Sequence, residues 1–147
     1  QRMERRFGEM VAAPYTTLWE GWEYTGARGM KYKSGHGTYN HAWSGGGLII
    51  LSQYIAGIEP IEPAFRLFSV EPNLAKLNFV KSVVPTQWGN ILLHAKKVER
   101  ELHISLEIPF GTEAVVRCPQ GYEKLACGDK MDKEFRLSSG EYMLIAK

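Results

Sequence analysis

The stretch Glu59-Pro60-Ile61-Glu62-Pro63 marks the point at which the hydrophobic pattern of this 147-residue chain changes. Two prolines within four residues end a preceding helix and stiffen the connection. Before this stretch apolar residues recur with a helical period, and after it they alternate or form β-branched runs. The sequence therefore predicts an α+β chain, with a short helical segment over residues 1–58 and a β domain over residues 59–147.

Seven segments after the boundary have strand character, and Pro, Gly, Asn and Ser separate them. Short strands at close spacing with such turn signals are typical of an antiparallel β-sandwich. The expected strands span residues 65–70, 77–84, 90–98, 101–108, 114–118, 134–137 and 141–146.

Two helices are expected before the boundary. The first, over residues 1–12, carries one apolar stripe of Met3, Phe7, Met10 and Val11. The second runs over residues 40–56, from Asn40 as N-cap to a stop at Gly57. It is apolar on nearly every side, so it has to be surrounded by the β domain, by another copy of the chain or by a missing segment. Its glycines at 45–47 indicate that a neighbour approaches closely.

Composition narrows the class of protein. The chain is 44% hydrophobic and 23% charged, which is typical of a folded globular protein, and its net charge is only +2. No basic block indicates a nucleic-acid partner or a membrane surface. Cys118 and Cys127 have no metal-ligand or redox spacing; two free thiols are favoured, with a hairpin disulfide as the alternative. The histidines show no ligand spacing either, so neither a metal nor a cofactor is expected.

Residues 16–43, TTLWEGWEYTGARGMKYKSGHGTYNHAW, combine a carboxylate between two indoles with a long glycine-containing loop and a histidine at a helix entrance. Loops of this length inside compact domains are often functional. Carboxylates, aromatic rings and a histidine are also what a pocket that cleaves sugars needs.

Five blocks of the chain resemble the bacterial α-L-rhamnosidases. TTLWE at 16–20, TYNH at 38–41 and YIAGI at 54–58 are similar to the end of the catalytic domain of that family, and FRLFSVEP at 65–72 and VVPTQWGNILLHAKK at 83–97 to the start of its C-terminal β-sandwich. The resemblance implies that residues 1–58 are the last helices of an incomplete (α/α)6 barrel. Thr38 stands where the family most often has Ser, and the insertion at 24–37 is less typical.

The resemblance also implies the roles of individual residues. Glu20 would be the general base of an inverting glycoside hydrolase, and His41 would hydrogen-bond a sugar hydroxyl. Trp19 and Trp22 would each contact the sugar or pack in the core. Each of the first two residues also has a structural alternative. Glu20 would then be a carboxylate stabilised by a helix dipole, and His41 would form its hydrogen bonds with backbone groups.

The function expected from this resemblance is removal of terminal α-L-rhamnose from rhamnose-containing glycosides or polysaccharides. The isolated chain would be inactive because the general acid lies upstream. The alternative is a non-catalytic β-sandwich accessory or carbohydrate-binding module, for which Trp88 is a candidate contact. Residues 1–58 are expected to mediate self-association. The compartment stays open, with a periplasmic or secreted location favoured over the cytoplasm.

Overall fold

The computed structural model describes residues 7–8, 10–12, 17–19 and 41–147, the last range without the side chains of Trp43 and Ser44. The chain divides into two compact units, Gln1–Ile50 and Leu51–Lys147. The assignment of residues 1–58 to a barrel and 59–147 to a sandwich domain stays a prediction.

In the first unit, Phe7, Gly8 and residues 10–12 are helical. Met10 is buried, as the apolar stripe predicts, but Val11 is 84% exposed, so its place in that stripe was wrong. The two residues are adjacent, and a helix turns by about 100° per residue, which carries Val11 away from the buried side of Met10.

A 3₁₀ turn, η1 (Ala42–Gly45), and the helix α2 (Gly46–Ile50) follow. The expected close approach at the glycines is confirmed at Gly47 alone, where an added Cβ would lie 2.6 Å from Cζ of Phe7. Gly45 and Gly46 face open space. Leu48, Ile49 and Ile50 are 68%, 56% and 41% exposed, so the described residues of the first unit do not by themselves surround this helix as the pattern requires.

The second unit begins with a π-helical turn, η2 (Leu51–Ile55), which ends when Ala56 N–H donates to the carbonyl of Leu51 at 2.9 Å. Gly57 then adopts φ = +70° and ends the helical run, as expected. A Cβ at Gly57 would overlap the Glu71 carbonyl oxygen, and the Glu71 N–H donates to the Gly57 carbonyl at 3.0 Å. Only glycine fits both the conformation and this close backbone approach.

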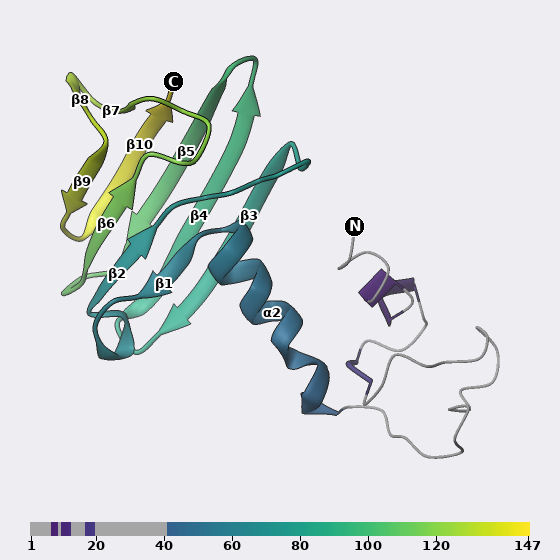
Figure 1. Cartoon of the computed structure of the whole chain (residues 1–147). Coiled ribbons are helices and arrows are strands. Elements are labelled where there is room, and N and C mark those ends of the chain that lie inside the picture. The colour runs from purple at the N-terminus through teal and green to yellow at the C-terminus, as the bar shows by residue number, and fades with distance from the viewer. Residues whose placement is uncertain (1–6, 9, 13–16, 20–40) are drawn as a thin grey trace, which may run out of the picture. The chain divides into compact units, whose positions relative to one another are not determined.

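The first sheet of the unit has four strands in the order β1-β2-β6-β9 (Figure 1). They are β1 (Ile58–Pro60), β2 (Leu67–Val70), β6 (Glu113–Arg117) and β9 (Glu134–Leu137). The turn η3 (Pro63–Phe65) lies between β1 and β2. The β2–β6 pair is parallel, with Leu67 opposite Glu113, whereas β1–β2 and β6–β9 are antiparallel.

The second sheet has six strands in the order β3-β4-β5-β10-β7-β8, all paired antiparallel. The last long strand along the chain, β10, lies between β5 and β7 and so joins the two parts of the sheet. The strands are β3 (Phe79–Thr86), β4 (Gly89–Val98), β5 (Glu101–Ile108), β7 (Leu125–Cys127), β8 (Lys130–Asp132) and β10 (Gly140–Ala146).

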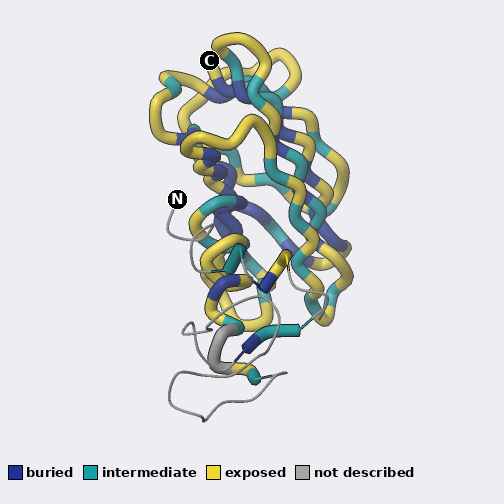
Figure 2. The backbone as a smooth tube through the Cα atoms, turned by 90° about the vertical axis from the view of Figure 1, so that its right-hand side faces the viewer, coloured by how far each residue is buried: buried dark blue, intermediate teal, exposed yellow. Residues whose placement is uncertain are grey.

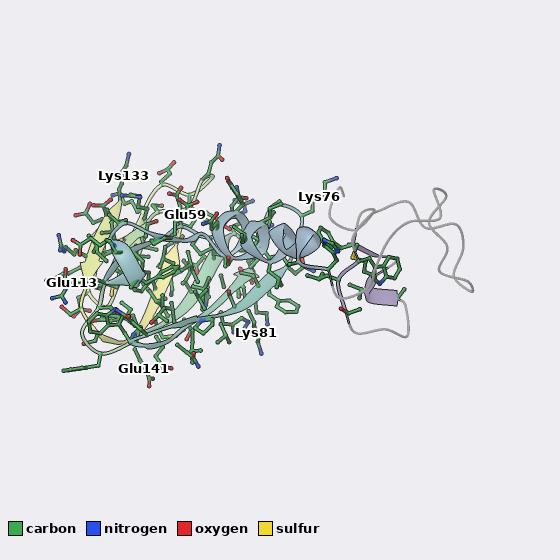
Figure 3. The ribbon with its side chains drawn as sticks, turned by 90° about the horizontal axis from the view of Figure 1, so that it is seen from below. Glu59, Lys76, Lys81, Glu113, Lys133 and Glu141 are labelled. Atoms are coloured by element: carbon green, nitrogen blue, oxygen red, sulfur yellow. The ribbon has the colours of Figure 1, made fainter. Side chains whose placement is uncertain are left out.

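The hydrophobic core lies between the two sheets. Buried residues alternate with more exposed ones along the strands (dark blue in Figure 2), as in β4, where Ile91, Leu93 and Ala95 are buried. Phe68 of β2 and Ile104 of β5 are fully buried. Figure 3 shows Lys81 and Glu141 on the outer face of one layer and Glu59 and Lys133 on the opposite side of the unit. The expected α+β fold, a short helical segment followed by a mostly antiparallel sandwich, is confirmed.

Both cysteines are free thiols, as favoured from the sequence. Cys127 ends β7 in the six-stranded sheet, and Cys118 follows β6 in the four-stranded sheet.

Candidate functional site

Two of the four predicted site residues lie among the described residues, in segments that are distant in sequence but hydrogen-bonded to each other. The His41 N–H donates to the carbonyl of Leu18 at 3.0 Å, which fixes the residue before Trp19 next to the start of the helical run. Trp19 is buried, at 5% exposure, and His41 is half-buried. The first unit therefore holds the backbone of Trp19 and that of His41 close together.

Gly47 makes a second close contact within the first unit. The Phe7 ring lies against the glycine backbone, since a Cβ at Gly47 would overlap it. Described residues from three separated segments, at 7–8 and 10–12, at 17–19 and at 41–50, belong to one compact unit.

Glu20 and Trp22 lie outside the described residues, and their roles stay predictions. The burial of Trp19 fits its core alternative, and its role as a sugar contact also stays a prediction.

Trp88 is the candidate contact residue in the alternative of a carbohydrate-binding module. It is half-buried in the turn between β3 and β4 and packs against Gly111 of the β5–β6 turn, so its expected place over a sandwich turn is confirmed. The guanidinium of Arg66 lies over its ring, 5.7 Å from the centroid. Arg66 therefore covers one face of the Trp88 ring.

The sequence did not single out two residues of the turns near Trp88, Phe110 and Arg66. Phe110 is 89% exposed at the tip of the β5–β6 turn, and Arg66 follows the turn η3. The one local signal for Phe110 is the segment Pro109-Phe110-Gly111-Thr112, which places a large apolar residue in a turn, where polar residues are usual. No local signal connects Arg66 with it, because the two belong to different turns.

A depression of the sandwich, with a volume of about 660 Å³, is lined by Cys118, Tyr122, Arg117 and Lys133 among others. Burial raises the pKa of the Cys118 thiol above its ordinary value, and this opposes formation of the reactive thiolate. Arg117 is paired with Glu134 through Nε and Oε2 at 2.9 Å. The arrangement thus disfavours nucleophilic catalysis by Cys118.

Within the described ranges, no three His, Cys, Asp or Glu side chains gather in a way that would hold a metal ion. Among the same residues, no helix combines the length and apolarity that crossing a membrane requires.

Solved structures with the same fold are α-L-rhamnosidases. The enzyme from Dictyoglumus thermophilum is 25% identical over the whole chain, with a TM-score of 0.72. The Streptomyces avermitilis enzyme, solved with L-rhamnose, is 20% identical over the whole chain, with a TM-score of 0.77. The Aspergillus terreus enzyme is 21% identical over 87% of the chain, with a TM-score of 0.66. The latter two likenesses show the fold alone.

The chain spans only 18%, 15% and 14% of these three solved chains, respectively. A search of curated protein sequences gave no match. The family model of the bacterial α-L-rhamnosidase C-terminal domain matches residues 57–132, which run from the glycine after η2 to the end of β8. With more than half of its residues covered by that model, the chain belongs to the family of the bacterial α-L-rhamnosidase C-terminal domain.

Proposed function

We propose that this chain is the C-terminal portion of a glycoside hydrolase that removes terminal α-L-rhamnose with inversion of the anomeric centre. The match of residues 57–132 to the family model supports this most directly. The likeness of the whole chain to the Dictyoglumus thermophilum enzyme extends the support to residues before the sandwich.

In this proposal Glu20 is the general base. An ionised carboxylate takes a proton from water and directs that water at the anomeric carbon, on the face opposite the departing group. The general acid would lie roughly 6.5–9.5 Å away, on an upstream segment, so that water fits between the base and the sugar. His41 would donate to or accept from a sugar hydroxyl, and Trp19 and Trp22 would line the pocket.

The hydrogen bond between His41 N–H and the Leu18 carbonyl supports this assignment of roles. Trp19 follows Leu18, and Glu20 follows Trp19. A backbone bond at Leu18 therefore keeps the segment that leads into Glu20 near the histidine, as a shared pocket requires.

The 147-residue chain by itself is expected to show negligible hydrolysis of an aryl α-L-rhamnoside. General acid catalysis alone supplies about 10²–10⁴-fold in rate, and the walls that orient the sugar would also be missing. The assay is release of the aryl alcohol, and turnover similar to that of an intact rhamnosidase would show the proposal to be wrong.

A longer polypeptide that includes the upstream coding residues tests the role of Glu20 directly. Glu20→Gln is expected to lower kcat by about 10²–10⁴-fold, because glutamine cannot accept the proton from water. Glu23→Gln, which changes a neighbouring carboxylate in the same way, is the matched control and should stay within a few-fold of wild type. Equal losses in both variants would contradict the assignment.

A further inference from the structure

Four turns meet at the end of the sandwich away from the C terminus (Figure 1). They follow β1, β3, β5 and β9, and three of them line a half-open cavity of about 470 Å³, which is within the range of small-ligand sites. Glu113, at the start of β6, is one of the residues that line it. We call this cavity the end pocket, and its lining includes Glu62, Arg66, Phe110, Arg136, Ser138 and Ser139.

Phe110 supplies an apolar surface to the end pocket. Its ring is 89% exposed, although the turn that carries it is well ordered by internal bonds. Thr112 is buried, and its Oγ1 donates to the Pro109 carbonyl at 2.8 Å, while Gly111 adopts φ = +79°. A structured turn therefore holds a phenyl ring out in solvent, where it costs free energy unless something covers it.

Arg66 supplies hydrogen-bond donors at the mouth of the same pocket. Its guanidinium stacks over Trp88, and it takes part in none of the carboxylate ion pairs found among the described residues. Trp88 itself is fixed, because its backbone N–H donates to Oγ1 of Thr86 at 3.1 Å. Stacking on an indole orients the planar donor fork in advance of any ligand.

The backbone before Arg66 is strained. Ala64 and Phe65 have φ values of +56° and +62°, which residues other than glycine rarely adopt. The Phe65 ring is held against Phe68 of the core, with centroids 6.3 Å apart. Such strain persists only where packing imposes it and often occurs at binding sites.

The rest of the lining is polar and electrically balanced. Arg136 Nε donates to Oε2 of Glu113 at 2.7 Å, so that pair is fixed. Glu62 offsets the charge of Arg66, and Ser138 and Ser139 add hydroxyl groups. Because two arginines face two glutamates, the lining has no net charge to attract a phosphate or a nucleotide.

We propose that the end pocket binds a neutral saccharide unit, separately from the catalytic pocket expected around Glu20. The C–H face of a sugar ring fits an exposed phenyl ring, and neighbouring hydroxyls fit the planar guanidinium and carboxylate groups beside it. This inference does not depend on hydrolysis, since its readout is binding.

The test is titration of the full ¹⁵N-labelled 147-residue chain with L-rhamnose and with D-galactose, followed by NMR of the amides at 66 and 110–112. We expect saturable shifts with a Kd in the millimolar range for at least one of the two sugars. Phe110→Ala and Arg66→Ala should each weaken this binding at least about fivefold. Phe79→Ala, which removes another exposed phenyl ring on β3, is the matched control and should leave Kd unchanged.

Several outcomes would overturn the proposal. They are no shift at these amides with either sugar, binding that survives both pocket variants, and binding of D-galacturonate or phosphate alone. Thermal melting of each variant shows whether it is folded, and a second pair, Phe110→Leu and Arg66→Gln, which also remove the aromatic face and the guanidinium, replaces any alanine variant that is not. Glu20→Gln should keep the binding at 66 and 110–112, so failure of the hydrolase proposal is distinguishable from failure of this one.

Discussion

Gly57 shows how a single residue controls the passage from helix to sandwich. Its left-handed conformation directs the chain from η2 into β1, and its missing side chain lets the backbone at Glu71 approach. The two requirements act together, because a side chain would meet both a disfavoured φ and a neighbouring carbonyl oxygen.

Substitution of Gly57 is therefore expected to destabilise the sandwich more than its conformation alone explains. Gly128→Ala is the matched control, because Gly128 has φ = +57° but nothing within 4 Å of an added Cβ. The control should lower the free energy of unfolding by about 1–2 kcal/mol, the usual cost of a left-handed alanine. Gly57→Ala should lower it by more than about 2 kcal/mol, because the overlap with Glu71 adds to that cost.

Urea denaturation of the two variants, monitored by circular dichroism, measures this difference. Equal destabilisation by Gly57→Ala and Gly128→Ala would show that the approach of Glu71 has no energetic effect.

At the scale of elements, strand β5 is the centre of the six-stranded sheet by its pairing. It bonds to β4 on one side and to β10 on the other, and Leu102, Ile104, Leu106 and Ile108 point into the core. Its predicted bounds agree with those in the structure, since its alternation of buried and exposed residues is uninterrupted.

Ile104→Ala should lower the free energy of unfolding by about 2–5 kcal/mol, because it removes buried apolar atoms and leaves a cavity. Val83→Ala removes a similar group from β3, where the side chain is 62% exposed, and should change stability by no more than about 0.5 kcal/mol. Chemical denaturation of the two variants measures the free energy of unfolding of each. A loss at Val83 as large as that at Ile104 would contradict the assignment of the core to the space between the sheets.

Sequence reasoning found the long strands and missed the short ones. β1, β7 and β8 have three residues each, too few to show an alternation, and β1 also contains Pro60, a residue that strands usually exclude. Pro60 is tolerated because β1 is an edge strand of its sheet. The parallel pairing of β2 with β6 was also missed, because strand direction depends on connections through the other sheet rather than on local pattern.

Sequence reasoning likewise found one candidate site and missed the other. The segments that contain Trp19 and His41 were grouped correctly as neighbours, because one local stretch of sequence and its resemblance to a family connect them. The end pocket was not predicted. Phe110 and Arg66 are brought together only by the packing of separate turns, and no residue spacing encodes that packing.

For the whole molecule, the exposed apolar residues of α2 predict self-association. Leu48 and Ile49 are mostly exposed, and burial of such a side chain contributes about 1.5–3 kcal/mol. Sedimentation velocity of the 147-residue chain is expected to show dimers or larger species. A Leu48→Gln/Ile49→Gln double variant should shift the distribution toward monomer, because it makes the contact surface polar.

Val83→Gln is the control for self-association, as it changes an exposed apolar residue of the sandwich instead. It should leave the distribution unchanged. A wild-type chain that sediments as a monomer while residues 42–50 stay helical and exposed would refute the prediction.

The position of β10 has a consequence for synthesis on the ribosome. Gly140–Ala146 lies between β5 and β7, so β7 and β8 have no place in their sheet until the last residues of this chain have left the exit tunnel. The edge of β5 that β10 covers stays open to other nascent chains until then. Deletion of residues 140–146 would leave that edge of β5 open, and is therefore expected to yield aggregates rather than a smaller sandwich.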